Sequence, residues 1–146
     1  MDYCIETIEL TRVFERVTAV DHLTMRVPRG SFFGFLGPNG AGKSTTIRIL
    51  TGMLLPTSGQ ALVLGMDVVR HPIEIKRRIG VAPEDSALFE NLTALEYLGF
   101  VGRIHGLPGS VIRARIDELL ALTALEKAAE VPVFEYSQGM RKKLAL

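Results

Sequence analysis

The sequence has 146 residues, of which 47% are hydrophobic and 23% charged, and its 17 basic and 16 acidic residues give a net charge of +1. This length is enough for one domain but not for two. A near-neutral chain with 7% aromatic residues offers neither a basic footprint nor a stacking platform, so nucleic acid is disfavoured as a partner.

The N-terminus predicts a reducing, cytoplasmic setting. Cys4 is the single cysteine and cannot form an internal disulfide, and the acidic start MDYCIE lacks the basic and apolar regions of a signal peptide. The uncharged stretch between Arg48 and Asp67 contains the sequence PTSGQ at 56–60, which would interrupt a membrane helix. No membrane-spanning helix is therefore expected.

The first third of the chain predicts β-structure. Residues 5–10 and 23–27 alternate as half-buried strands do, and the sequence PRG at 28–30 marks a turn. The continuous apolar run FFGFL at 32–36 is typical of a parallel strand that is buried on both faces. Further along, the sequence ALVLGMD at 61–67 predicts a strand that leads into a turn.

A glycine-rich loop follows the predicted buried strand. The sequence GPNGAGKSTT at 37–46 matches the pattern GxxxxGK[ST], and Ile47, Leu50 and Leu54 continue it with helical spacing. Glycines let consecutive backbone N–H groups approach a polyphosphate at the positive end of the helix. The lysine would contact the β- and γ-phosphates, and the serine hydroxyl would bind Mg²⁺. The expected phosphate-binding residues are Gly37, Pro38, Asn39, Gly40, Ala41, Gly42, Lys43, Ser44 and Thr45.

The alternative is a glycine-rich turn that binds no ligand. The pattern arises by accident in roughly one chain of this length in a few hundred, and a flanking strand and helix make an accident rarer. The dinucleotide pattern GxGxxG does not occur, which rejects a Rossmann site. The GTPase pattern NKxD is also missing, although another P-loop enzyme such as a small kinase stays open.

Residues 86–135 have a helical pattern. Thr93 and Glu96 predict a capping box, ahead of a helix with an apolar face. A second helix has an apolar stripe that lies opposite a charged face. The predicted stripe consists of Ile112, Ile116 and Leu119, and the charged face of Arg113, Asp117 and Glu118. After this region, Ser137 precedes a basic, amphipathic run that predicts the start of another helix.

Four segments together resemble the nucleotide-binding domain of ATP-binding cassette (ABC) transporters. They are the loop at 37–46, PTSG at 56–59, IGVAPE at 79–84 and YSQGM at 136–140, and they occur in the family's order and approximate spacing. The sequence looks most like the ATP-binding subunits of bacterial drug or polysaccharide exporters. The resemblance implies an α/β fold: an ABC-type P-loop NTPase, truncated, with an N-terminal β subdomain, a P-loop core and a helical subdomain.

The resemblance also implies a division of the chain, 1–146, as a partial ABC ATPase domain. Residues 1–85 would form the β subdomain and P-loop core, including the loop that carries Glu84. Residues 86–136 would form the helical subdomain, which docks on the transmembrane partner in the family. Residues 137–146 would form the signature and the start of its helix.

The resemblance assigns further site residues. Phe14 matches the aromatic residue that stacks on adenine, where the alternative is a core phenylalanine. Glu84 stands where the family usually has the glutamine that reaches Mg²⁺ and the attacking water. A carboxylate can bind Mg²⁺ but cannot donate a hydrogen bond as an amide does. The alternative for Glu84 is a solvated loop glutamate. Ser137 and Gly139 match signature residues that grip the γ-phosphate of ATP held in trans by the other subunit, where the alternative is a plain helix N-cap. The implied metal ligands are thus Ser44 and Glu84.

The implied cofactors are ATP and Mg²⁺. The implied partners are a second ATP-binding subunit, in a head-to-tail dimer, and a transmembrane permease subunit that holds the protein at the inner face of the cell membrane. The family's Mg²⁺-binding aspartate, catalytic glutamate and switch histidine cannot be placed, because His22, His71 and His105 all precede the signature. We therefore expect a fragment competent at most for nucleotide binding. A non-transport ABC protein, such as a repair or translation factor, and a non-catalytic nucleotide-binding module stay open.

Overall fold

Two twelve-residue strands, β1 (Tyr3–Phe14) and β2 (Val17–Pro28), pair as an antiparallel hairpin. β3 (Ser58–Val63) adds to the other side of β1, and the two-residue strand β4 (Met66–Asp67) pairs with β3. The sheet order is β2-β1-β3-β4, and every pair is antiparallel. The strands predicted at 5–10 and 23–27, and the strand and turn predicted at 61–67, are confirmed.

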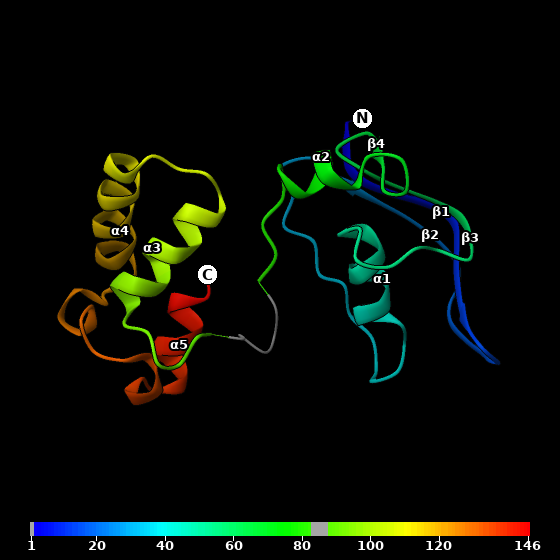
Figure 1. Ribbon diagram of the computed structural model, residues 1–146. Coiled ribbons are helices and arrows are strands. Elements are labelled where there is room, and N and C mark those ends of the chain that lie inside the picture. The colour runs from blue at the N-terminus through cyan, green and yellow to red at the C-terminus, as the bar shows by residue number, and fades with distance from the viewer. Residues whose placement is uncertain (1, 83–87) are drawn as a thin grey trace. The chain divides into compact units, whose positions relative to one another are not determined.

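The computed structural model describes residues 2–82 and 88–146. The chain divides into two compact units, Met1–Val81 and Ala82–Leu146. Figure 1 shows that the first unit contains the sheet with α1 and α2, and that the second contains α3, α4 and α5. Each unit has its own hydrophobic core.

In the first unit, helix α1 (Lys43–Leu50) and the short helix α2 (Pro72–Lys76) supply the apolar groups that cover the sheet. The core consists of Leu10, Ile49, Leu50, Ala61, Val63, Val68 and Ile75. The helix predicted after the glycine-rich loop is confirmed, and of its three spaced apolar residues Leu50 is buried in the core. Leu54 lies beyond the helix and packs against the core, whereas Ile47 is exposed and Ile49 is fully buried.

The prediction of a buried strand at 32–36 is wrong. The segment forms no strand, and Phe32 and Leu36 are almost fully exposed, at 108% and 91% of their reference areas. A strand that is buried on both faces needs neighbouring strands and covering layers. Within 2–82 and 88–146, the only sheet is the antiparallel one, and this segment pairs with none of its strands. The apolar run therefore reaches the surface.

The second unit is helical. It consists of α3 (Ala94–Ile104), α4 (Gly109–Thr123) and α5 (Gln138–Leu144), with short 3₁₀ turns η1 (Glu126–Ala128) and η2 (Val133–Glu135) before α5. Its core is formed by Ala94, Ile112, Ile116, Leu120, Leu125, Val133, Tyr136 and Leu144. α3 and α4 pack closely: a Cβ on Gly102 would collide with Ile112.

The capping box at the start of α3 is confirmed. The backbone N–H of Glu96 donates to the Thr93 hydroxyl, and the Glu96 carboxylate accepts from the Thr93 backbone N–H and hydroxyl. The bonds from Thr93, the backbone bond first, hold the pKa of Glu96 below its usual range. In α4, Ile112 and Ile116 are buried as predicted, but the stripe continues through Leu120, because Leu119 is 39% exposed.

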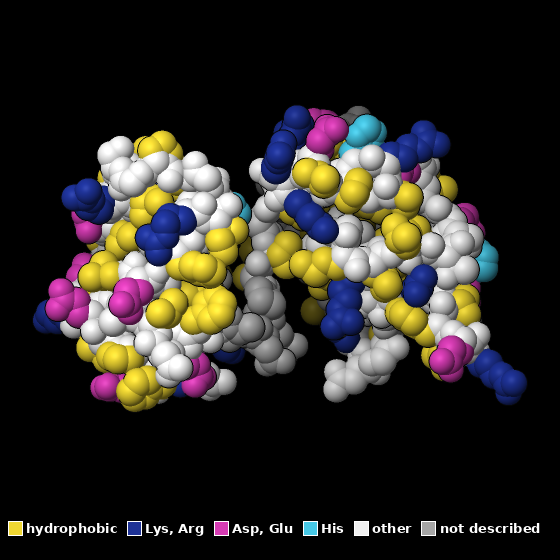
Figure 2. Space-filling view, viewed as in Figure 1, with side chains coloured by type: hydrophobic (Ala, Val, Ile, Leu, Met, Phe, Trp, Pro, Cys, Tyr) yellow, Lys and Arg dark blue, Asp and Glu magenta, His cyan; other side chains and the backbone are white. Residues whose placement is uncertain are grey.

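Hydrophobic side chains reach the surface at several places in both units (Figure 2). Among the residues that the structure describes, no helix has the length and apolar composition that crossing a membrane requires.

We expect Thr93→Ala to lower the free energy of unfolding by about 0.5–2 kcal/mol, because the change removes the N-cap of α3. Urea unfolding followed by circular dichroism measures the loss. Thr123→Ala is the matched control, since the Thr123 hydroxyl bonds to carbonyls of its own helix and caps nothing. Equal losses in the two variants would contradict a specific capping role.

Candidate nucleotide-binding site

The glycine-rich loop ends where it meets strand β2. Gly42, the N-cap of α1, has a φ of +82°, in the left-handed region that favours glycine. A Cβ at this position would collide with the backbone carbonyl of Ala19 and would lie 3.3 Å from a methyl group of Val20. Only glycine lets the loop come this close to the sheet.

This contact also sets the loop near Phe14. In the β1–β2 hairpin, Val20 pairs with Arg12, and Val17 pairs with Phe14. Ala19, which Gly42 touches, therefore lies within a few residues of the position opposite Phe14. The structure thus brings the loop and the end of β1 together within the first unit.

The start of α1 has unused hydrogen-bond donors. Within the described chain, the backbone N–H groups of residues 42–45 make no hydrogen bond, and the first bond of the helix is from the N–H of Thr46 to the carbonyl of Gly42. The first turn of any helix leaves such donors, and they favour an anion. This turn is held in place because Ile49 and Leu50, on the same helix, are buried against the sheet.

Lys43 bends back over the loop. Its ammonium donates to the carbonyls of Gly37 and Pro38, at 2.6 and 2.7 Å. The positive charge therefore lies on the same loop whose glycines and helix turn supply the backbone donors. The Ser44 side chain is exposed at the beginning of α1. This grouping of a cation, backbone N–H groups and a hydroxyl suits a phosphate with a bound metal ion.

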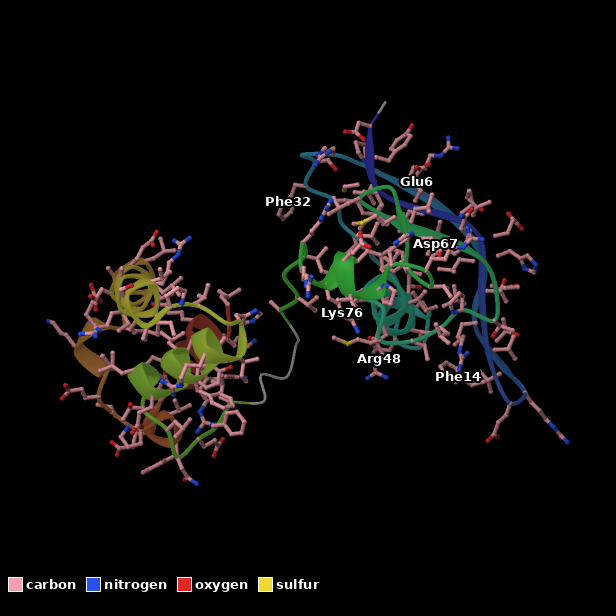
Figure 3. All side chains as sticks on the ribbon, turned by 45° about the horizontal axis from the view of Figure 1, so that its top comes forward. Glu6, Phe14, Phe32, Arg48, Asp67 and Lys76 are labelled. Atoms are coloured by element: carbon pink, nitrogen blue, oxygen red, sulfur yellow. The ribbon has the colours of Figure 1, made fainter. Side chains whose placement is uncertain are left out.

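Phe14 is the last residue of β1 and is 40% exposed. It is not a core phenylalanine. Figure 3 shows it near the end of the strand, away from Glu6. Its ring is available for stacking from solvent, although the guanidinium of Arg12 lies over it.

Ser137 and Gly139 belong to the second unit. Ser137 is the N-cap of α5, and its hydroxyl accepts from the backbone N–H of Met140 at 3.3 Å. Both residues are exposed at the start of the helix. The predicted helix after Ser137 is confirmed, whereas a role toward a nucleotide stays a prediction. Glu84 lies outside the described residues.

Arg141, which no sequence motif singles out, fixes the segment before Ser137. Its guanidinium donates to the carbonyls of Phe134 and Tyr136, at 3.0 and 3.2 Å, and pairs with Glu90 ahead of α3. The Tyr136 side chain is buried, and its hydroxyl donates to the carbonyl of Ala128 at 2.6 Å. Burial raises the pKa of Tyr136. The contact with Glu90 joins residues far apart in sequence, so only the charge of Arg141 could have hinted at it.

Comparison with known proteins decides the family. The family described as "ABC transporter" matches residues 20–146. The chain belongs to the ABC transporter family. It is 40% identical over 142 residues to the probable multidrug ABC transporter ATP-binding protein YbhF of Escherichia coli (strain K12), covering 97% of this chain and 25% of YbhF. It is 43% identical over 140 residues to the daunorubicin/doxorubicin resistance ATP-binding protein DrrA of Streptomyces peucetius, covering 96% of this chain and 42% of DrrA.

The fold of this ABC-family chain also matches a solved structure. It superposes with a TM-score of 0.85 and 30% identity on cbiO1 of Clostridium perfringens, described as part of the ABC transporter complex cbiONQ, over 99% of this chain and 60% of cbiO1. The expected α/β fold of the ABC type is therefore confirmed. The chain spans less than half the length of these two curated relatives.

We expect Gly42→Ala to destabilise the protein more than Gly40→Ala. Both glycines have a φ near +82°, so alanine at either position costs about 1–2 kcal/mol for the left-handed backbone. Gly40 has open space around it, whereas at Gly42 the new methyl group meets β2, which adds roughly 1–3 kcal/mol. Urea unfolding of both variants measures the difference. The same cost at both positions would mean that the loop does not press against β2.

Proposed function

We propose that this chain is the nucleotide-binding part of an ABC transporter and that its binding of MgATP drives export through a membrane partner. The observation that carries the proposal is the glycine-rich loop seated on β2, with Lys43 over it and Phe14 close by. The loop would hold the phosphates, and Phe14 would stack on the adenine. Both groups lie in one unit of the chain, as one ligand requires.

The residues present fit ATP and Mg²⁺. Gly42 stands where a side chain would strike β2, and the backbone donors of residues 42–45, which make no hydrogen bond within the described chain, belong to a helix start, which favours an anion. Ser44 would be one Mg²⁺ ligand, and Glu84 a second. A bound Mg²⁺ supplies positive charge that offsets the charge of the transferred phosphoryl group.

Hydrolysis and transport are proposed for the whole protein. Ser137 and Gly139 would contact the γ-phosphate of ATP held by a second ATP-binding subunit, in a head-to-tail dimer. A permease subunit would hold this dimer on the inner face of the cell membrane. Export is the proposed direction, because the names of two relatives refer to multidrug transport and drug resistance.

We expect Lys43→Ala to weaken ATP binding about 10- to 100-fold, the effect of losing charge-assisted hydrogen bonds. Adenosine binding should change little, because the ammonium addresses only phosphates. Titration calorimetry of the purified chain with each ligand measures both affinities. Lys76→Ala is the matched control, since Lys76 is an exposed lysine of the same unit at the end of α2. Equal losses for ATP and adenosine would place Lys43 away from the phosphates.

In the whole protein, we expect Ser137→Asp to abolish ATP-dependent self-association while leaving α5 stable. Aspartate is as good an N-cap as serine, but its charge would repel the phosphate of the partner's nucleotide. Sedimentation velocity with and without ATP measures association, and urea unfolding checks stability. Ser110→Asp, at the start of α4, is the control for added charge. Undiminished association in the Ser137 variant would contradict a contact in trans.

A further inference from the structure

The guanidinium of Arg12 covers one face of the Phe14 ring. Its central carbon lies 4.5 Å from the ring centroid. The two residues are two positions apart at the end of β1, so their side chains leave the strand on the same side. Arginine stacks on an aromatic face because the cation meets the negative face of the ring.

A second set of contacts fixes Arg12 independently of Phe14. Its Nη1 donates to the carbonyl of Leu55 at 3.0 Å. Leu55 lies in the segment that runs from the end of α1 to β3. That segment is itself bonded to β1, because the Val13 N–H donates to the Thr57 hydroxyl and the Thr57 N–H donates to the carbonyl of Thr11. The guanidinium is therefore held between the strand end and the segment that follows the phosphate-binding helix.

Part of the Arg12 side chain is buried. The Nε atom is buried and has no hydrogen-bond partner among the described residues. A buried polar group without a partner is costly. The guanidinium keeps this position with its central carbon over the Phe14 ring.

We propose that Arg12 is a positioning residue for the nucleotide base: it backs the Phe14 ring and fixes its orientation, so that the exposed part of the ring receives adenine. This inference rests on the proposed function. A ring at the end of a strand loses rotamer freedom when a base stacks on it, and a ring that is already fixed loses less. Arg12 also ties the base-binding end of β1 to the segment that follows α1. The phosphate loop lies at the opposite, N-terminal end of α1.

The experiment compares two ligands, ATP and inorganic tripolyphosphate, by titration calorimetry of the purified chain. Arg12→Ala should weaken ATP binding about 2- to 10-fold, because binding must then order the Phe14 side chain that Arg12 had already fixed. Tripolyphosphate, which has no base, should bind with unchanged affinity. In the Phe14→Ala background, Arg12→Ala should cause no further loss of ATP affinity, because Arg12 acts through the ring.

Two further variants keep the result interpretable. Arg12→Lys retains the charge and a donor for Leu55 but lacks the flat group, so it should keep the melting temperature and still lose ATP affinity. Arg16→Ala removes an exposed arginine in the turn between β1 and β2, so it should change neither affinity.

The results of these titrations either support or overturn the positioning role of Arg12. Equal losses for ATP and tripolyphosphate in the Arg12 variants, or additive losses with Phe14→Ala, would overturn the positioning role and leave Arg12 as a structural tie. Full ATP affinity in Arg12→Lys would do the same. If the unchanged chain binds tripolyphosphate as tightly as ATP, the base adds no affinity, and the proposed roles of Phe14 and Arg12 are both overturned. A parent chain that binds neither ligand would overturn the proposed function itself, and this inference with it.

Discussion

The approach of Gly42 to the carbonyl of Ala19 is the contact on which the arrangement of the site depends. This contact joins Gly42, the residue before α1, to strand β2 of the β1–β2 hairpin. The hydrophobic contacts of Ile49 and Leu50 then hold the rest of the helix against the sheet. Because the close packing of Gly42 and the buried face of the helix both fix the C-terminal end of the loop, the backbone donors at that end keep one direction.

In the second unit, hydrogen bonds fix the position of a helix start. The segment ahead of Ser137 has two short 3₁₀ turns and little regular structure. Its carbonyls are satisfied by Arg141 and by the buried hydroxyl of Tyr136. These bonds determine where α5 begins, and so where the exposed serine lies. In both units, the position of a helix start is set by contacts between neighbouring residues and the rest of the unit, and not by the loop alone.

Features determined by neighbours in sequence could be predicted, and those determined by distant contacts could not. The capping box of Thr93 and Glu96 and the N-cap at Ser137 depend on three or four consecutive residues, so the pattern was sufficient. The apolar run at 32–36 has the composition of a buried strand, but a strand forms only beside another, and composition does not supply one. The buried face of α1 and the place of Leu120 in the core of α4 depend on what each helix packs against. The bond from Arg12 to the carbonyl of Leu55 joins residues 43 positions apart, so the sequence pattern does not reveal it.

The exposed residues Phe32 and Leu36 give the protein a surface whose interactions respond to conditions differently from those of the phosphate loop. Covering apolar area lowers the heat capacity, and the driving force near room temperature is entropic. Association through this segment would therefore strengthen on warming and would not be weakened by added salt. Contacts between Lys43 and a phosphate are electrostatic and weaken as ions screen them. Salt and temperature thus provide two independent ways to separate contacts at this segment from binding at the loop.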